Sequence, residues 1–171
     1  ITNPETGTPN GKPAKFIYFS KPDNGAYNIV ASASSLTKYE IQILTYDTDG
    51  QHEKFVFLGI VGQGNTDNYS VQFNKENSSN SSSNQIVTFD SLISDIQSLH
   101  SLHEINLRNH LSLFARAKVA KKLSGNTFTK KLSVSLLKSM DKQILWAKGH
   151  GISDNAYNIL HNDIQSLIAS I

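Results

Sequence analysis

Residues 77–84 read NSSNSSSN, a stretch made of serine and asparagine alone. Such a segment buries no apolar surface, and its side chains bond to nearby backbone groups in competition with helices and strand ladders. We therefore expect a flexible linker over residues 77–87. On this prediction the chain consists of a leading linker at 1–13, a β domain at 14–76 and a helical domain at 88–171.

Before this linker, apolar and polar residues alternate with a period of two, as in Tyr69, Val71 and Phe73. This period is typical of half-buried strands. Turn sequences such as the Asp47-Thr48-Asp49-Gly50 segment separate the alternating runs. We expect strands near 14–20, 26–34, 38–46, 53–60 and 68–74. The pattern predicts a small antiparallel, Ig-like β-sandwich.

After the linker the apolar period changes to 3.6 residues, which is typical of amphipathic helices. Glycines at 125, 149 and 151 interrupt the pattern, and short connections favour antiparallel neighbours. The four apolar faces run over 89–99, 107–123, 128–147 and 156–168. The predicted fold class is therefore α+β in two separate domains, with an antiparallel β-sandwich followed by an all-α four-helix bundle.

The composition excludes several classes of protein. The chain has 171 residues and no cysteine, so it holds no disulfide framework, thiol nucleophile or cysteine-ligated metal. The longest apolar run, Phe55–Val61, is too short to span a bilayer, so we expect no transmembrane segment. No basic-then-apolar signal segment opens the sequence, so for an exported protein we expect the signal to be removed or to lie upstream.

Charge is distributed unevenly along the chain. Ten basic residues fall between Arg108 and Lys148, where Asp141 is the only acid. This excess predicts attraction to an anionic surface, such as an acidic glycan, a cell-wall polymer or lipid headgroups. The alternative is an ordinary solvated face. The candidate binding residues are Arg108, Arg116, Lys121, Lys122, Lys130, Lys131, Lys138 and Trp146. Few aromatic residues lie among them, so nucleic acid is not an expected partner.

Aromatic residues of the β domain are candidates for stacking on sugar rings, as aromatic faces do in binding clefts. The candidates are Tyr18 and Tyr39, with Tyr46, Tyr69 and Trp146 as further members. The alternative is that strand tyrosines are half-buried residues of the sandwich.

Two short motifs are candidates for metal binding. His100 and His103 share a helix face if the helix continues through them, and with Glu104 nearby they are candidate zinc ligands. A helix end also favours histidine through the helix dipole, without any metal. Asp47 and Asp49, with Asp67, are candidate calcium ligands, although a hairpin turn needs Asp-Gly at this place in any case. No other cofactor is expected.

Residues 89–171 resemble the bacterial FIMAH domain, a helical module. The residues that carry the resemblance are Leu92-Ile93-x-Asp95-Ile96-Gln97-Ser98-Leu99, Glu104-Ile105-Asn106, Leu137-x-x-Met140-x-x-x-Ile144, Gly149-x-Gly151-Ile152-Ser153 and Asn162-Asp163-x-x-x-Leu167-Ile168. Met140-Asp141 stands where the family has Phe-Ile. The resemblance implies the helical fold and no catalytic residues.

The first half is similar to β-sandwich modules near the C-termini of large secreted bacterial proteins. The shared features are Pro22-x-x-Gly25-x-Tyr27, Tyr46-Asp47-x-Asp49-Gly50, Gly59 and Gly64-x-Thr66-Asp67-x-Tyr69. Together the two resemblances imply a non-catalytic accessory region of an extracellular, secreted bacterial protein.

Three functions remain open on the sequence. The first is attachment to an extracellular glycan, cell wall or anionic polymer, with other domains of a parent protein as further partners. The second is a structural spacer that has no ligand of its own. The third is a metal-dependent hydrolase that uses His100, His103 and Glu104.

Overall fold

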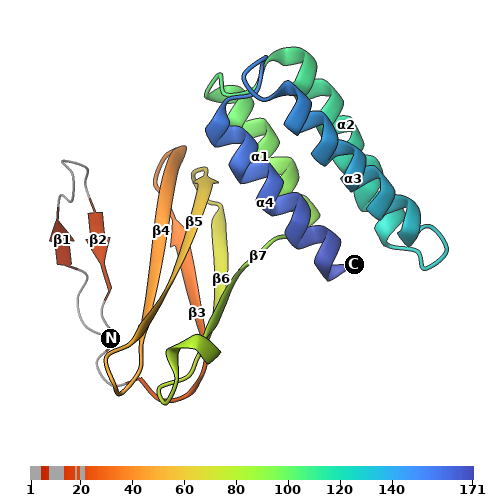
Figure 1. The fold of residues 1–171 in the computed structure, drawn as a ribbon. Coiled ribbons are helices and arrows are strands. Elements are labelled where there is room, and N and C mark those ends of the chain that lie inside the picture. The colour runs from red at the N-terminus through yellow and green to blue at the C-terminus, as the bar shows by residue number, and fades with distance from the viewer. Residues whose placement is uncertain (1–4, 8–13, 18, 20–21) are drawn as a thin grey trace.

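The computed structural model describes residues 5–7, 14–17, 19 and 22–171, and it has a mixed α+β architecture (Figure 1). Its strands are β1 (Glu5–Gly7), β2 (Ala14–Phe16), β3 (Gly25–Ser32), β4 (Thr37–Tyr46), β5 (His52–Val61), β6 (Thr66–Phe73) and β7 (Ser82–Ile86). Its helices are α1 (Phe89–Ser101), α2 (Leu107–Ser124), α3 (Lys130–Ala147) and α4 (Asp154–Ser170).

Part of the predicted leading linker is a strand. Residues 5–7 form β1, which pairs antiparallel with β2, so the expectation of a linker does not hold for them. The rest of that segment, residues 1–4 and 8–13, lies outside the described residues, as does Tyr18.

Two antiparallel sheets form the main β structure, with strand orders β3-β6-β7 and β4-β5. The period-two pattern explains the register: Tyr69 of β6 lies opposite Ile29 of β3, and Phe57 of β5 lies opposite Ile41 of β4. Side chains from both sheets pack into one apolar cluster. Its members are Tyr27, Ile29, Ala31, Tyr39, Ile41, Ile43, Phe55, Phe57, Tyr69 and Val71.

The Ser/Asn stretch is ordered structure where a flexible linker was expected. Residues 78–80 form a 3-10 turn, and residues 82–86 form β7, which pairs with β6 from Asn68↔Ile86 to Gln72↔Ser82. Asn77 caps the turn through its side chain. The physical reason is that β6 offers an open edge, and backbone ladder bonds do not require apolar side chains.

The helices begin and end where local chemistry favours it. Thr88 and Ser91 form a capping box at the start of α1, and the side chains of Asn106 and Ser153 cap α2 and α4. The turn between α3 and α4 uses Gly149 and Gly151, both at positive φ. The inner faces of the four helices meet in a buried core, as the 3.6-residue period predicts.

The sheets and the helices share a contact, which we call the seam. It is formed by α1 and α4, which lie beside β5, whereas α2 and α3 lie on the far side of the helical layer (Figure 1). Ile60 of β5 is buried within the helical core, with Leu36 and Leu58 packed against it. Lys38 of β4 forms an ion pair with Glu104, and Asn65 Nδ2 donates a hydrogen bond of 3.1 Å to Ser94 Oγ. Among the described residues, the helices lack a segment of the length and apolarity needed to cross a bilayer.

Candidate functional site

The outward face of α3 carries a line of lysines that ends at a tryptophan. Lys131, Lys138, Lys142 and Trp146 follow one another at spacings of seven, four and four residues, which places them on one face of the helix. All four are exposed, whereas Leu137 and Ile144 are buried on the opposite face. We call these four residues the α3 stripe.

The neighbouring helix α2 adds further basic side chains. Arg108, Lys118 and Lys122 are exposed on it, and Arg116 donates a hydrogen bond of 3.1 Å to Ser139 of α3. The Lys118 ammonium lies 4.2 Å from the centre of the Phe114 ring. Together with the α3 stripe, these residues form a basic outer face on α2 and α3.

Most of this charge has no ionic partner among residues 22–171. Lys121 pairs with Asp90 at 2.5 Å, and Lys148 pairs with Asp154 at 3.7 Å. Within residues 22–171, the other basic residues of the predicted set make no ion pair shorter than 4.0 Å. They are Arg108, Arg116, Lys118, Lys122, Lys130, Lys131, Lys138 and Lys142. The predicted basic residues thus lie together on α2, α3 and the turns at their ends.

Large apolar side chains lie within the same surface. Trp146 is 79% exposed at one end of α3, and Phe128 is 94% exposed at the other. Leu132 and Leu145 are also exposed on α3. A basic surface that includes exposed aromatic and aliphatic groups can combine ionic attraction with apolar contact.

Among the strand tyrosines, Tyr46 is 54% exposed, whereas the candidate Tyr39 is half-buried. Its hydroxyl donates to Asp67 Oδ2 at 2.5 Å and lies 2.6 Å from the hydroxyl of Tyr69, which is fully buried. A Cβ atom on Gly59 would overlap the Tyr39 ring, so glycine is needed at this close approach. The Tyr39 ring therefore packs closely on Gly59, and its hydroxyl is already bonded within the protein.

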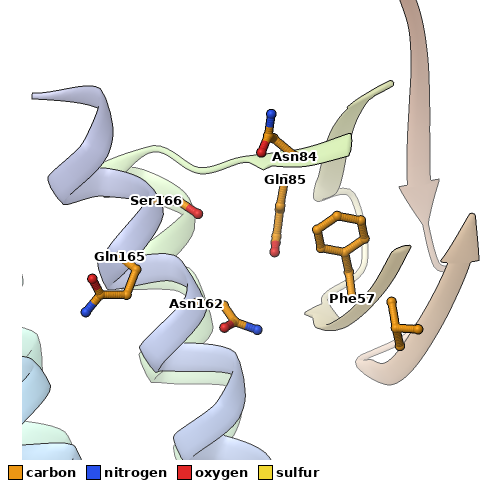
Figure 2. Close-up of a pocket in the computed structure, with 7 residues that line it drawn as sticks. Phe57, Asn84, Gln85, Asn162, Gln165 and Ser166 are labelled. Atoms are coloured by element: carbon orange, nitrogen blue, oxygen red, sulfur yellow. The ribbon is translucent and has the colours of Figure 1, made fainter. Parts of the chain in front are cut away.

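A polar pocket lies between the edge strands and the helical layer. It has a volume of about 260 Å³ and is lined by Val56 and Phe57 of β5, Asn84 and Gln85 of β7, and Asn162, Gln165 and Ser166 of α4. In Figure 2 the side chains of Gln85, Asn162 and Ser166 point into the space between α4 and the strands. Gln165 instead donates from Nε2 to Asp141 Oδ2 at 2.9 Å. We call this site the amide pocket.

Three carboxyl groups are buried at the seam. Asp95 comes from α1, Asp163 from α4 and Asp67 from β6, and each is at most 7% exposed. The Asp95 and Asp163 carboxyls lie close enough for their charges to interact. Neither oxygen of Asp163 has a hydrogen-bond partner among the described residues. A buried carboxyl group without a donor favours its neutral, protonated form.

Burial and mutual repulsion raise the pKa values of these acids. Burial raises the pKa of Asp163 to about 7, and the negative charge of Asp67 adds to the effect. The pKa of Asp95 is also raised, first by burial and then by repulsion from Asp163. Burial raises the pKa of Asp67, although the hydrogen bond from Tyr39 opposes the shift. The seam is thus an apolar environment in which carboxyl groups favour their protonated form.

The predicted zinc cluster does not form. Helix α1 ends at Ser101, and His103 adopts a φ of 61°, so His100 and His103 do not share a helix face. The His100 Nδ1 atom is 2.9 Å from the carbonyl oxygen of Ile105, and Glu104 accepts from Lys38 and Ser153. The Lys38 ammonium and the Ser153 hydroxyl lower the pKa of Glu104. Across the described residues, no three or more His, Asp or Glu side chains are grouped closely enough to hold a metal ion.

The predicted calcium ligands are separated. Asp47 Oδ1 accepts the backbone N–H groups of Asp49 and Gln51, and its Oδ2 accepts that of Ser78. These bonds, with that from Ser78 first, lower the pKa of Asp47. Asp67 instead lies beside Tyr39 of β4. Tyr39 precedes Asp47 by eight residues, which at about 3.3 Å per residue places Asp67 roughly 26 Å from Asp47. The Asp47-Gly50 segment is therefore a turn, and Asp67 belongs to the seam.

The sequence carries a signal for the buried acids. Asp95 lies between Leu92 and Ile96 on the inner face of α1, and Asp163 lies between Leu160 and Ile164 on that of α4. A carboxylate at a core position of an amphipathic helix indicates a special environment. The amide pocket had no comparable signal, because its residues come from β5, β7 and α4, which are distant in the sequence.

Comparison with known proteins adds no relative to this description. No protein-family model, no curated protein and no solved structure matches the chain.

Proposed function

We propose that this chain is a non-catalytic accessory region of a secreted, extracellular bacterial protein, and that it attaches to an anionic polymer through the outer face of α2 and α3. The observation that carries the proposal is the α3 stripe, in which three exposed lysines lead along one helix face to an exposed tryptophan. An acidic glycan or an anionic cell-wall polymer is the ligand that such a surface favours.

The electrostatics of this face support a charged ligand. The lysines of the α3 stripe form no ion pair within residues 22–171, so binding a polyanion does not require existing ion pairs there to be broken. Basic residues near an anionic surface each contribute about 1 kcal/mol, and the contribution falls off within a Debye length. Three lysines on one face therefore provide useful affinity only when the polymer presents several negative charges.

The proposal includes the finer architecture. We propose that the two facing sheets are an Ig-like β-sandwich and that the helical half is a FIMAH-like domain, so that the chain consists of two domains in contact. The apolar cluster between the sheets and the common core of the four helices support this division. No cofactor is part of the proposal.

The experiment is retention on an immobilised polyanion, with polygalacturonate as the probe and dextran as the uncharged control. Replacing Lys138 and Lys142 by glutamine is expected to lower affinity by roughly tenfold or more, since two charges leave the stripe. The matched control is the Lys54→Gln/Lys75→Gln variant, which removes the same charge from one exposed lysine of β5 and one in the turn after β6.

Salt separates the charge-driven mechanism from other kinds of binding. Retention should weaken steadily as salt is raised to about 0.5 M, because screening shortens the range of the attraction. Retention that is unchanged over this range would contradict the proposal, as would equal losses for the two double variants. Absence of binding to polygalacturonate, to a wall polymer rich in phosphate and to anionic vesicles would favour a structural spacer.

A further inference from the structure

We propose that the amide pocket binds an uncharged saccharide unit. The pocket is a second site, separate from the basic outer face, because it lies on the side of α4 that faces β5 and β7 (Figure 2). Contacts between separately packed layers are places where ligand pockets commonly form.

The side chains of the pocket suit a ligand that is rich in hydroxyl groups. Four carboxamides and one hydroxyl line it, and the lining contains no acidic or basic residue. A carboxamide both donates and accepts hydrogen bonds, and a sugar hydroxyl does the same. An ionic ligand would find no opposite charge in this lining, so the chemistry favours a neutral one.

These polar groups are available for a ligand. In the described part of the chain, the side chains of Asn84, Gln85, Asn162 and Ser166 make no hydrogen bond with other protein groups. Gln165 is the exception, since it is bound to Asp141. The free groups of Gln85, Asn162 and Ser166 point into one space, so they can bond a ligand without breaking bonds inside the protein.

An aromatic ring supplies the apolar part of the site. Phe57 lines the pocket, and its ring lies 5.1 Å from that of Tyr69, centre to centre, so the ring is held by the core behind it. The apolar faces of sugar rings pack on aromatic side chains, while their hydroxyls reach the surrounding polar groups. The volume of about 260 Å³ lies just below the range of roughly 300–1,000 Å³ that is usual for larger ligands, so one sugar unit suits it.

The test is a titration followed by ¹⁵N–¹H NMR, in which the side-chain amide signals of Asn84, Gln85 and Asn162 report directly on the pocket. The probes are glucose, galactose, mannose, N-acetylglucosamine and their β-linked disaccharides, in about 0.5 M salt to suppress ionic binding. At least one probe should shift these three signals, with a dissociation constant that is roughly millimolar for so small a ligand.

Matched variants locate the binding. Asn162→Ala should weaken it roughly three- to tenfold through the loss of a hydrogen bond, and Asn162→Trp should abolish it by filling the space. Asn158→Ala is the control, since Asn158 is exposed one turn earlier on the same helix and outside the lining. Both positions are exposed, so all three variants should keep the wild-type fold.

Several results would overturn the proposal. They are the absence of any shift in the pocket signals with every probe, or binding that Asn162→Trp leaves unchanged. Shifts along the backbone of residues 82–86 alone, on addition of an extended peptide, would assign the site to a peptide strand instead. The Lys138→Gln/Lys142→Gln variant should bind the sugars normally, so failure here is distinguishable from failure of the polyanion proposal.

Discussion

Charged residues have opposite environments in two regions of the molecule, the outer face of α2 and α3 and the seam beside α1 and α4. On the outer face, lysines extend into water, where a charge costs little and few partners are needed. At the seam, Asp95 and Asp163 are buried with Asp67 nearby, and their carboxyls are driven towards the protonated form. The contrast teaches that solvation, more than residue type, decides whether a charge is available to a ligand.

The two regions also differ in what a substitution should change. Seam residues are held by packing on both sides, so replacing them should alter stability. Residues of the outer face contact mainly solvent, so replacing them should alter binding alone.

The largest effect is expected on α3, which has both a buried inner face and an exposed outer face. Leu137→Ala should lower the free energy of unfolding by about 2–5 kcal/mol, because Leu137 is fully buried on the inner face of α3. Leu145→Ala, on the exposed side of the same helix, should change it by less than about 0.5 kcal/mol. Urea denaturation followed by far-UV circular dichroism measures both. Similar losses for the two variants would contradict the assignment of inner and outer faces.

The second effect concerns close packing at the seam. Gly59→Ala should destabilise the protein by about 1–3 kcal/mol, since the added methyl group would overlap the Tyr39 ring. The control is Gly62→Ala, where the nearest atom to the new methyl group is 3.6 Å away and no loss is expected. Thermal unfolding of the two variants makes the comparison. A Gly59→Ala variant as stable as the wild type would show that Tyr39 moves freely.

The third effect depends on pH. The pKa of Asp163 is raised to about 7 from its ordinary 3.8, so the folded state retains a proton that the unfolded state has released. Stability from this group is therefore complete below about pH 4, falls as the pH rises towards about 7 and is lost above it. Asp163→Asn removes the titration and should gain about 1–3 kcal/mol at pH 8, but nothing near pH 4.

The measurement for Asp163 is the difference in unfolding free energy between wild type and variant from pH 4 to pH 8, which cancels the titration of other groups. Asp49→Asn, at an exposed turn position, is the control for the chemical change itself. A variant that is less stable than the wild type at pH 8 would mean that the Asp163 carboxylate has a favourable partner.

The smallest effect on stability is expected at the end of the α3 stripe. Trp146→Ala should change the free energy of unfolding by less than about 0.5 kcal/mol, because the indole is largely exposed. In the wild-type protein, acrylamide should quench Trp146 fluorescence readily, and polygalacturonate should protect it. Poor quenching without polymer would contradict the exposed position.

Most elements could be predicted from the sequence because the apolar period is a local property. The strands from Gly25 to Phe73 and the four helices lie close to their expected ranges. The prediction of a flexible linker over the Ser/Asn stretch was wrong, because its pairing with the open edge of β6 depends on a strand elsewhere in the chain.

For the candidate sites as well, local features could be predicted from the sequence, whereas contacts between distant segments could not. By itself, the sequence determined the periods, the turns and the density of basic residues between Arg108 and Lys148, since each depends on neighbours within a few positions. Only the tertiary structure decided that Tyr39 is hydrogen-bonded to Asp67, that Asp95 lies near Asp163 and that amides from β7 and α4 line one pocket with Phe57 of β5. Burial and proximity between distant segments arise from packing, and a local pattern carries no information about which side chains packing will bring together.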